Sequence, residues 1–141
     1  MASELTKQER DKLIQAARTA ALAAYAPYSK FRVGAAVLGS QGIAVGVNVE
    51  NASYGLALCA ERAALASALA KGEKRIRAIA IACIDAAPDR GLSELLPCGA
   101  CRQWMVELAQ DAEIIVCGGE RVQSFKVEEL IPQPFRLGKP A

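Results

Sequence analysis

Two stretches of the sequence are apolar along almost their whole length and are each as long as a strand. They read RIRAIAIACI, residues 75–84, and EIIVCG, residues 113–118. A strand that is covered by helices on both faces has this continuous apolar pattern, whereas a strand with one exposed face alternates between apolar and polar residues. The two stretches therefore predict the buried centre of a sheet.

The segments around these runs carry helical and strand-like patterns. Thr6 and Glu9 have the form of a capping box, and apolar residues then recur at helical spacing as far as a stop before Pro27. The alternation of helices and strands along the chain predicts a mixed α/β sandwich with helices covering the sheet. We expect further helices over residues 58–71 and 98–110, strands over 33–38, 43–47, 75–84, 113–118 and 121–127, and a short helical turn after residue 127.

The composition excludes several classes of partner. The chain has 141 residues, the length of one ordinary domain, and we expect a single domain over residues 1–141. A net charge of +2 gives no basic patch for nucleic acid, and 5% aromatic residues are too few for a base-stacking surface. No apolar run approaches the ~18 residues that cross a bilayer, and the charged start MASELTKQERDK lacks the apolar core of a signal peptide. We therefore expect a cytoplasmic protein that binds neither nucleic acid nor a membrane.

The chain contains no histidine, and this limits its chemistry. A histidine-based triad, a histidine metal ligand and proton transfer by an imidazole are all excluded. Catalysis would have to use carboxylates, thiolates, lysine or a metal ion. Cysteines are reduced in the cytosol, so closely spaced cysteines there indicate metal or redox chemistry before structural disulfides.

Three of the five cysteines have positions that suit a metal site. Cys98 and Cys101 are three residues apart at the predicted start of a helix, directly after Pro97, so both sulfurs lie on one face of its first turn. Cys59 lies at the start of the preceding predicted helix. A helix N-terminus favours thiolate over thiol, so two N-termini that meet would present three thiolates to one cation. Zinc suits this ligand set, and a fourth position left open is typical of catalytic zinc, which lowers the pKa of bound water to roughly 7.

Glu61 stands two residues after Cys59, in the first turn of the predicted helix. A carboxylate at that position could take a proton from the zinc-bound water and pass it to a substrate nitrogen. The simpler interpretation is a solvated side chain on the helix surface. Arg62 is either a surface charge or a hydrogen-bond donor to the thiolates, because three thiolates and Zn²⁺ together carry a charge of −1.

Other interpretations of the cysteines remain open. A lone C-x-x-C pair also occurs as half of a structural zinc site or as a redox pair, but a long loop precedes this one instead of the strand and turn of a redox motif. A structural site made only of cysteines needs a fourth ligand. Cys83 and Cys117 lie in predicted buried strands, where free cysteines act as small apolar residues. The additional Cys-x-Glu motif favours the catalytic interpretation.

The chain resembles the cytidine deaminase family, in its short, three-cysteine, tetramer-forming branch. Zinc deaminases combine a ligand-x-Glu motif with Pro-Cys-x-x-Cys. Here these motifs are Cys59-Ala60-Glu61 and Pro97-Cys98-Gly99-Ala100-Cys101. Further motifs occur in the order found in the family: PYSKFRVGAA at 27–36, GVNVENASYG at 46–55 and ELIPQPF at 129–135. The resemblance implies a three-layer α/β/α sandwich of the cytidine deaminase type, built on a five-stranded mixed sheet.

The resemblance also implies roles at the metal and in the substrate pocket. Cys59, Cys98 and Cys101 would bind one zinc ion per subunit, and Glu61 would be the proton shuttle. Seven residues would contact the substrate, and some of them would act across subunits of a homotetramer with shared active sites. They are Phe31, packing against the nucleoside; Asn48 and Glu50, holding the ribose hydroxyl; Ala60, whose backbone contacts the pyrimidine; Ala52 and Tyr54, reaching the 5′-hydroxyl of a neighbouring subunit; and Phe135, closing over the base.

The implied activity is hydrolysis of free cytidine and deoxycytidine to uridine and deoxyuridine plus ammonia, a step of pyrimidine salvage. Zinc-bound hydroxide would attack C4 while Glu61 protonates N3 and then the departing amine. A blasticidin-S-type aminohydrolase shares the metal motif, but Phe31 and the segment Asn48-Val49-Glu50-Asn51 favour a plain nucleoside. A polynucleotide or deoxycytidylate deaminase usually has histidine as its first ligand. A structural zinc module for protein interaction is the alternative outside the enzymes, and it would need a closed site with four ligands.

Overall fold

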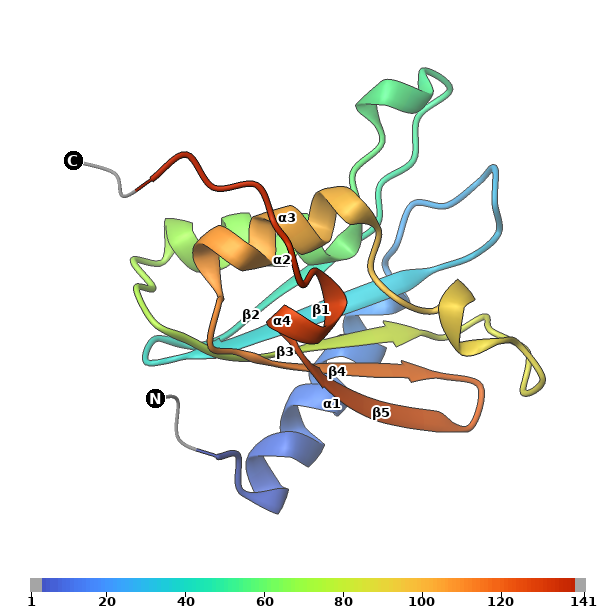
Figure 1. Ribbon diagram of the computed structural model, residues 1–141. Coiled ribbons are helices and arrows are strands. Elements are labelled where there is room, and N and C mark those ends of the chain that lie inside the picture. The colour runs from blue at the N-terminus through green and yellow to red at the C-terminus, as the bar shows by residue number, and fades with distance from the viewer. Residues whose placement is uncertain (1–3, 139–141) are drawn as a thin grey trace.

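The computed structural model of the chain describes residues 4–138. One sheet of five strands lies at the centre of this part of the chain, and helices cover both of its faces (Figure 1). Helix α1 (Lys7–Ala21) packs on one face, and α2 (Ala60–Ala70) and α3 (Gly99–Leu108) pack on the other, next to each other. The architecture is therefore the expected three-layer α/β/α sandwich.

The strands of the sheet follow the order β2-β1-β3-β4-β5. β3 and β4 are parallel, with Ala80 opposite Ile115, and the other three neighbouring pairs are antiparallel. β3 and β4 are also buried on both faces, which confirms the prediction from their continuous apolar runs. The bounds of the strands are β1 (Val33–Gly39), β2 (Gly42–Val47), β3 (Ile76–Cys83), β4 (Glu113–Gly118) and β5 (Arg121–Lys126).

The helices differ from the expected ones mainly at their ends. The capping box is confirmed, because Thr6 Oγ1 accepts from the Glu9 N–H and Glu9 Oε1 accepts from the Thr6 N–H, each at 3.0 Å. α2 begins after Cys59, two residues later than expected, because Leu58 still pairs with Val49 as a β-bridge. Within residues 4–138, no helix has the length and apolar character that crossing a membrane requires.

Four elements remain: the edge strand β5, one short helix and two 3₁₀ turns. β5 is exposed along most of its length, and only Phe125 is partly buried against the core. The helix α4 (Val127–Leu130) follows it directly. Short 3₁₀ turns, Tyr54–Leu56 and Leu92–Glu94, occur in the β2–α2 and β3–α3 connections.

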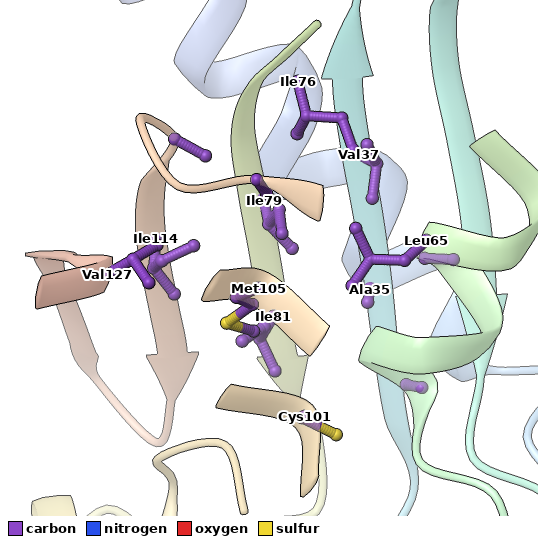
Figure 2. Packing of buried hydrophobic residues seen from close by; sticks show 14 of the residues in the cluster. Ala35, Val37, Leu65, Ile76, Ile79, Ile81, Cys101, Met105, Ile114 and Val127 are labelled. Carbon is purple, nitrogen blue, oxygen red and sulfur yellow. The ribbon is translucent and has the colours of Figure 1, made fainter. Parts of the chain in front are cut away.

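The core is divided between the two faces of the sheet, and side-chain size differs between them. On β3, three alanines face α1, whereas larger residues face α2 and α3. Figure 2 shows Ile79 and Ile81 of β3 beside Met105 of α3, with Ile114 and Val127 next to them. The small side chains let α1 come close to the sheet, and the larger ones fill the wider space under α2 and α3. The three alanines are Ala78, Ala80 and Ala82.

Two glycines of the sheet touch helix backbone directly. A Cβ atom at Gly34 would collide with the carbonyl oxygen of Ala17 in α1 and lie 2.5 Å from the Ala21 nitrogen. A Cβ atom at Gly46 would collide with the Ala64 nitrogen and lie 2.8 Å from the carbonyl oxygen of Ala60 in α2. Each helix therefore needs a strand residue without a side chain at its closest approach to the sheet.

The carboxylate of Glu73 is buried where the end of α2 meets the β1–β2 turn. Oε2 accepts from the Gln41 N–H at 2.7 Å, and Oε1 accepts from the Ser40 hydroxyl at 3.0 Å and from the Arg75 N–H at 3.2 Å. Burial acts to raise the pKa of Glu73, but these hydrogen bonds outweigh it and lower the pKa to about 2. The ionised carboxylate thus fastens two turns together.

Replacing Glu73 with glutamine is expected to lower the free energy of unfolding by about 1–3 kcal/mol at pH 7, because the amide is uncharged and has one acceptor oxygen instead of two. A carboxylate with a lowered pKa contributes stability above its unfolded pKa near 4.5 and loses it as the pH falls towards 2. The wild type should therefore lose stability over that interval more steeply than Glu73→Gln. Urea unfolding at pH 7 and melting curves from pH 2 to 5 measure both effects.

Glu120→Gln is the matched control for Glu73→Gln, since Glu120 is an exposed carboxylate in the β4–β5 turn. It should change the free energy of unfolding by less than about 0.5 kcal/mol. Equal effects of the two substitutions would contradict the fastening role of Glu73.

Candidate active site

Two helix N-termini bring three cysteines together. Cys59 is the N-cap residue of α2, Cys98 is the N-cap residue of α3, and Cys101 lies in the first turn of α3. Neither N-cap side chain makes a capping hydrogen bond to its own helix. All three thiols lie near backbone N–H groups and the positive ends of helix dipoles, which favour thiolates. In Figure 2, Cys101 lies one helical turn from Met105, at the edge of the core.

The spacing of the three sulfurs fits a zinc ion. Cys98 Sγ lies 3.7 Å from Cys59 Sγ and 3.6 Å from Cys101 Sγ, and all three sulfurs lie within 4.8 Å of one another. Zn–S bonds of about 2.3 Å in tetrahedral geometry separate the sulfurs by about 3.8 Å. Among the described residues, the only such cluster of possible metal ligands is this set of three, so a bound ion would keep one position for a ligand from solution.

Arg62 and the thiols control the charge of the cluster. Contacts with the Cys101 thiol and with the Arg62 guanidinium lower the pKa of Cys59 to about 5, and Arg62 Nη2 lies 3.4 Å from Cys59 Sγ. The contact with Cys59, together with burial, raises the pKa of Cys101. A bound cation would favour ionisation of all three sulfurs. Arg62 thus contacts the sulfur cluster, as the second of its two sequence interpretations expected.

Glu61 is the buried carboxyl group of the site. It is 5% exposed and follows Ala60, the fully buried first residue of α2. Burial raises the pKa of Glu61 to about 7, and the negative charge of Cys59 raises it further against the opposing effect of Arg62. A carboxyl group with such a pKa can both accept and donate a proton near neutral pH, which is the property of a general acid and base. The structure does not place Glu61 in solvent, so the simpler sequence interpretation is wrong.

Phe31, Asn48 and Glu50 form a second group, linked by hydrogen bonds. The Asn48 side chain donates to the Phe31 carbonyl and accepts from the Val33 N–H, each at 2.9 Å. Glu50 accepts from the N–H groups of Tyr28 and Ser29 and from the Ser29 hydroxyl, which in turn accepts from the Phe31 N–H. These bonds lower the pKa of Glu50 and keep it ionised.

A β-bridge connects this second group to the metal cluster. Val49, between Asn48 and Glu50, exchanges two backbone hydrogen bonds of 2.9 Å with Leu58, the residue before Cys59. The segment that carries the two polar side chains therefore lies directly beside the first cysteine. The structure thus brings the predicted metal ligands, Glu61 and the predicted ribose contacts into one region.

The other predicted substrate contacts lie on exposed segments. Ala52 and Tyr54 belong to the loop that projects from the sandwich in Figure 1, and the Tyr54 side chain is 83% exposed. Tyr54 lines an open cavity of about 290 Å³ together with Glu50. Phe135 is 71% exposed, and its carbonyl accepts from the Gln103 side chain of α3 at 2.8 Å.

Sequence reasoning missed the residues that support Phe31. Arg90 lies over its ring, Ser29 bonds its N–H, and Arg32, the next residue, makes a two-pronged contact with Asp85 at 2.8 and 2.9 Å. Arg90 and Asp85 are far from Phe31 in the sequence and belong to no local pattern. Their partners follow from the β1–β3 pairing, which brings the ends of these strands together.

Comparison with known proteins identifies relatives along almost the whole chain. Residues 7–118 match the family described as the cytidine and deoxycytidylate deaminase zinc-binding region. The cytidine deaminase of Halalkalibacterium halodurans is 42% identical over 130 residues, which are 90% of this chain and 94% of the relative. The cytidine deaminase of Mycobacterium tuberculosis H37Rv is 42% identical over 122 residues, which are 86% of this chain and 85% of the relative.

Solved structures agree with these sequence matches. The crystal structure of cytidine deaminase from Burkholderia pseudomallei superimposes with a TM-score of 0.78 at 43% identity, covering 93% of this chain and all of that one (100%). Cytidine deaminase from Mycobacterium tuberculosis gives a TM-score of 0.74 at 36% identity, covering 92% of this chain and 98% of that one. The sandwich and its strand order therefore have counterparts determined by experiment.

Proposed function

The chain belongs to the cytidine and deoxycytidylate deaminase family, and on that premise we propose that it hydrolyses free cytidine and deoxycytidine to uridine and deoxyuridine, releasing ammonia. One observation carries the proposal. Three sulfurs at zinc spacing lie beside a buried glutamate, at the junction of two helix N-termini. This arrangement combines a metal position that is open to solution with a group that can move protons.

Cys59, Cys98 and Cys101 would hold one zinc ion per subunit. When bound, zinc lowers the pKa of a water molecule so that a hydroxide nucleophile is available near neutral pH. Three thiolates with Zn²⁺ carry a total charge of −1, which opposes that effect. The guanidinium of Arg62, in contact with Cys59, offsets this excess of negative charge.

Glu61 would move the protons of the reaction. It accepts a proton from the attacking water and passes it to N3 of the cytosine ring as the new C4–O bond forms. It then takes the second proton from the new C4 hydroxyl and delivers it to the exocyclic amine, so that the C4–N bond breaks, ammonia leaves and the C4=O bond of the product forms. Burial keeps Glu61 in one place and out of exchange with bulk water, so each proton stays within the site.

Asn48, Glu50 and Phe31 would orient the nucleoside. The Asn48 amide donates one hydrogen bond to the protein backbone and accepts one from it. Its second N–H and the second lone pair of its oxygen remain available for a ribose hydroxyl. Glu50 is held as an anion and can accept from the same hydroxyl. The Phe31 ring would pack against the nucleoside, and the backbone at Ala60 would contact the pyrimidine. Deoxycytidine keeps the 3′-hydroxyl, so both substrates satisfy these contacts.

We also propose that the enzyme is a homotetramer with shared active sites. The projecting loop carries Tyr54 and Leu56 with exposed fractions of 83% and 72%, and large exposed apolar side chains on one loop suit burial by a neighbouring subunit. Ala52 and Tyr54 would contact the 5′-hydroxyl of the neighbour's substrate, and Phe135 would close over the base. The three thiolates must stay reduced to bind zinc, so we place this step of pyrimidine salvage in the cytoplasm.

The purified protein is expected to contain one zinc ion per subunit and to convert cytidine and deoxycytidine. Loss of the cytosine ultraviolet absorbance measures turnover, elemental analysis measures zinc, and a chelator should abolish both. Cys98→Ala should lose zinc and activity. Cys117→Ala, a buried cysteine of β4 on the α1 side of the sheet, is the matched control and should keep both. A zinc-loaded protein that is inert toward both nucleosides would refute the proposed function.

A further inference from the structure

The loop between β3 and α3 contacts the Phe31 segment at two points. In the first, the backbone N–H and the guanidinium of Arg32 donate hydrogen bonds to the carboxylate of Asp85, at the start of the loop. The second is an aromatic contact, in which the guanidinium carbon of Arg90 lies 4.9 Å from the centroid of the Phe31 ring. This distance lies within the range of a cation–π interaction, and arginine is the cation most often found in such pairs.

Arg90 itself is held in place by its own loop. Its N–H donates to the Ala87 carbonyl at 3.0 Å, and its Nη1 lies 3.1 Å from Oε2 of Glu94, in the 3₁₀ turn. The side chain is 37% exposed, and that of Glu94 is 56% exposed. A partly exposed ion pair of this kind contributes little to the stability of the fold. Stability alone therefore does not explain why the guanidinium lies over the Phe31 ring.

Hydrogen bonds fix the backbone of Phe31 on both sides. Its N–H donates to the Ser29 hydroxyl at 3.0 Å, and its carbonyl accepts from the Asn48 amide at 2.9 Å. The orientation of the ring depends instead on packing, since a phenyl group has no hydrogen-bonding atoms. Phe31 is half-buried, with part of its side chain against the core and part accessible. Arg90 supplies a directional contact to the ring face, which packing alone does not give.

Arg90 lies over Phe31, whose side chain packs against the core on the α2 and α3 side of the sheet, and Glu61 belongs to α2. The buried Cys83 thiol at the end of β3 lies within electrostatic reach of both groups. Burial is the main cause that raises the pKa of Cys83, to about 12, while the charge of Glu61 raises it further and the charge of Arg90 lowers it. The contact with Phe31 therefore places Arg90 at the border of the proposed nucleoside site.

We propose that Arg90 is a positioning residue that holds the Phe31 ring in the orientation in which it packs against the nucleoside. This inference rests on the proposed function, because it assigns Arg90 to the binding of that same substrate. Without the guanidinium, the ring would have more freedom in the unbound protein, and binding would have to restrict it at a cost in affinity. The chemical step, which depends on Glu61 and the metal ligands, should be unaffected.

Steady-state kinetics with cytidine test the proposal on the full chain loaded with zinc. Arg90→Met keeps an apolar stem but removes the charge, and it should raise KM about threefold to fivefold with kcat within twofold of the wild type. Arg90→Lys keeps a cation and should recover at least half of the lost affinity. Arg121→Met, in the exposed edge strand β5, is the matched control and should leave KM unchanged.

A double-mutant cycle tests whether Arg90 acts through Phe31. Phe31→Leu should raise KM, and adding Arg90→Met to that variant should raise it no further, because the ring partner is already gone. Additive effects, or unchanged kinetics of Arg90→Met alone, would overturn the positioning role while leaving the proposed function intact. A wild type inert toward cytidine would overturn both.

Discussion

Glu61→Gln should fold, bind zinc as the wild type does, and turn over cytidine about three to four powers of ten more slowly. Glutamine has almost the same shape as glutamate, so the buried position beside Ala60 can hold it without a cavity. Its amide cannot accept a proton from water and pass it on at neutral pH. The variant therefore separates proton transfer from metal binding, which depends on the three cysteines.

The comparison for Glu61→Gln is Glu107→Gln, because Glu107 is an exposed carboxylate on α3, the other helix of the site. It should retain full activity. Single-turnover rates measure the chemical step, and zinc content and melting temperature verify that each variant is intact. Wild-type rates in Glu61→Gln would show that another group moves the protons, whereas loss of zinc from that variant would show that Glu61 supports the metal site.

A large loss of stability is expected from Gly46→Ala. The added Cβ atom would overlap the Ala64 nitrogen, and it would lie 2.7 Å from the carbonyl carbon of Ala63 and 2.8 Å from the carbonyl oxygen of Ala60. All three atoms are helix backbone, which cannot rotate away as a side chain can. Overpacking of a core costs about 1–3 kcal/mol and more where backbone must move, so we expect a loss of about 3 kcal/mol or more in the free energy of unfolding.

Gly46→Ala should also weaken zinc binding, because the displaced part of α2 begins directly after Cys59. Urea unfolding and competition for zinc with a coloured chelator measure the two effects. Gly91→Ala is the control, since Gly91 has φ −66° and a Cβ atom added there would have no neighbouring atom within 4 Å. It should change the free energy of unfolding by less than about 0.5 kcal/mol. A stable Gly46→Ala variant would mean that α2 can move away from the sheet at little cost.

Local patterns predicted the elements of the fold well, and the reason is physical. The apolar runs of β3 and β4 and the capping box of α1 are local patterns. Each predicts its strand or helix from a few neighbouring residues, independently of the remaining sequence. Boundaries failed where a tertiary contact decided them. Leu58 has the pattern of a helix start, but its hydrogen bonds to Val49 keep it extended.

The candidate site shows the same division. The spacing of Cys98 and Cys101 predicted two ligands on one helical turn, and Glu61 followed from its distance to Cys59. The contact of Arg90 with Phe31 and the hydrogen bonds of Glu73 to Ser40 and Gln41 join residues that no local rule connects. Such partners become visible only when strand pairing is known, because the pairing brings distant segments together.

The two hydrogen bonds between Val49 and Leu58 fix the distance between the two ends of the loop that connects these residues. They set the separation of Glu50 from Cys59, whatever the intervening residues 51–57 do. That loop can therefore be lengthened, shortened or rebuilt in a design library while the anchor points at its base stay in register. Attempts to redirect the enzyme toward nucleosides with altered sugars should begin with these seven positions and leave Val49 and Leu58 unchanged.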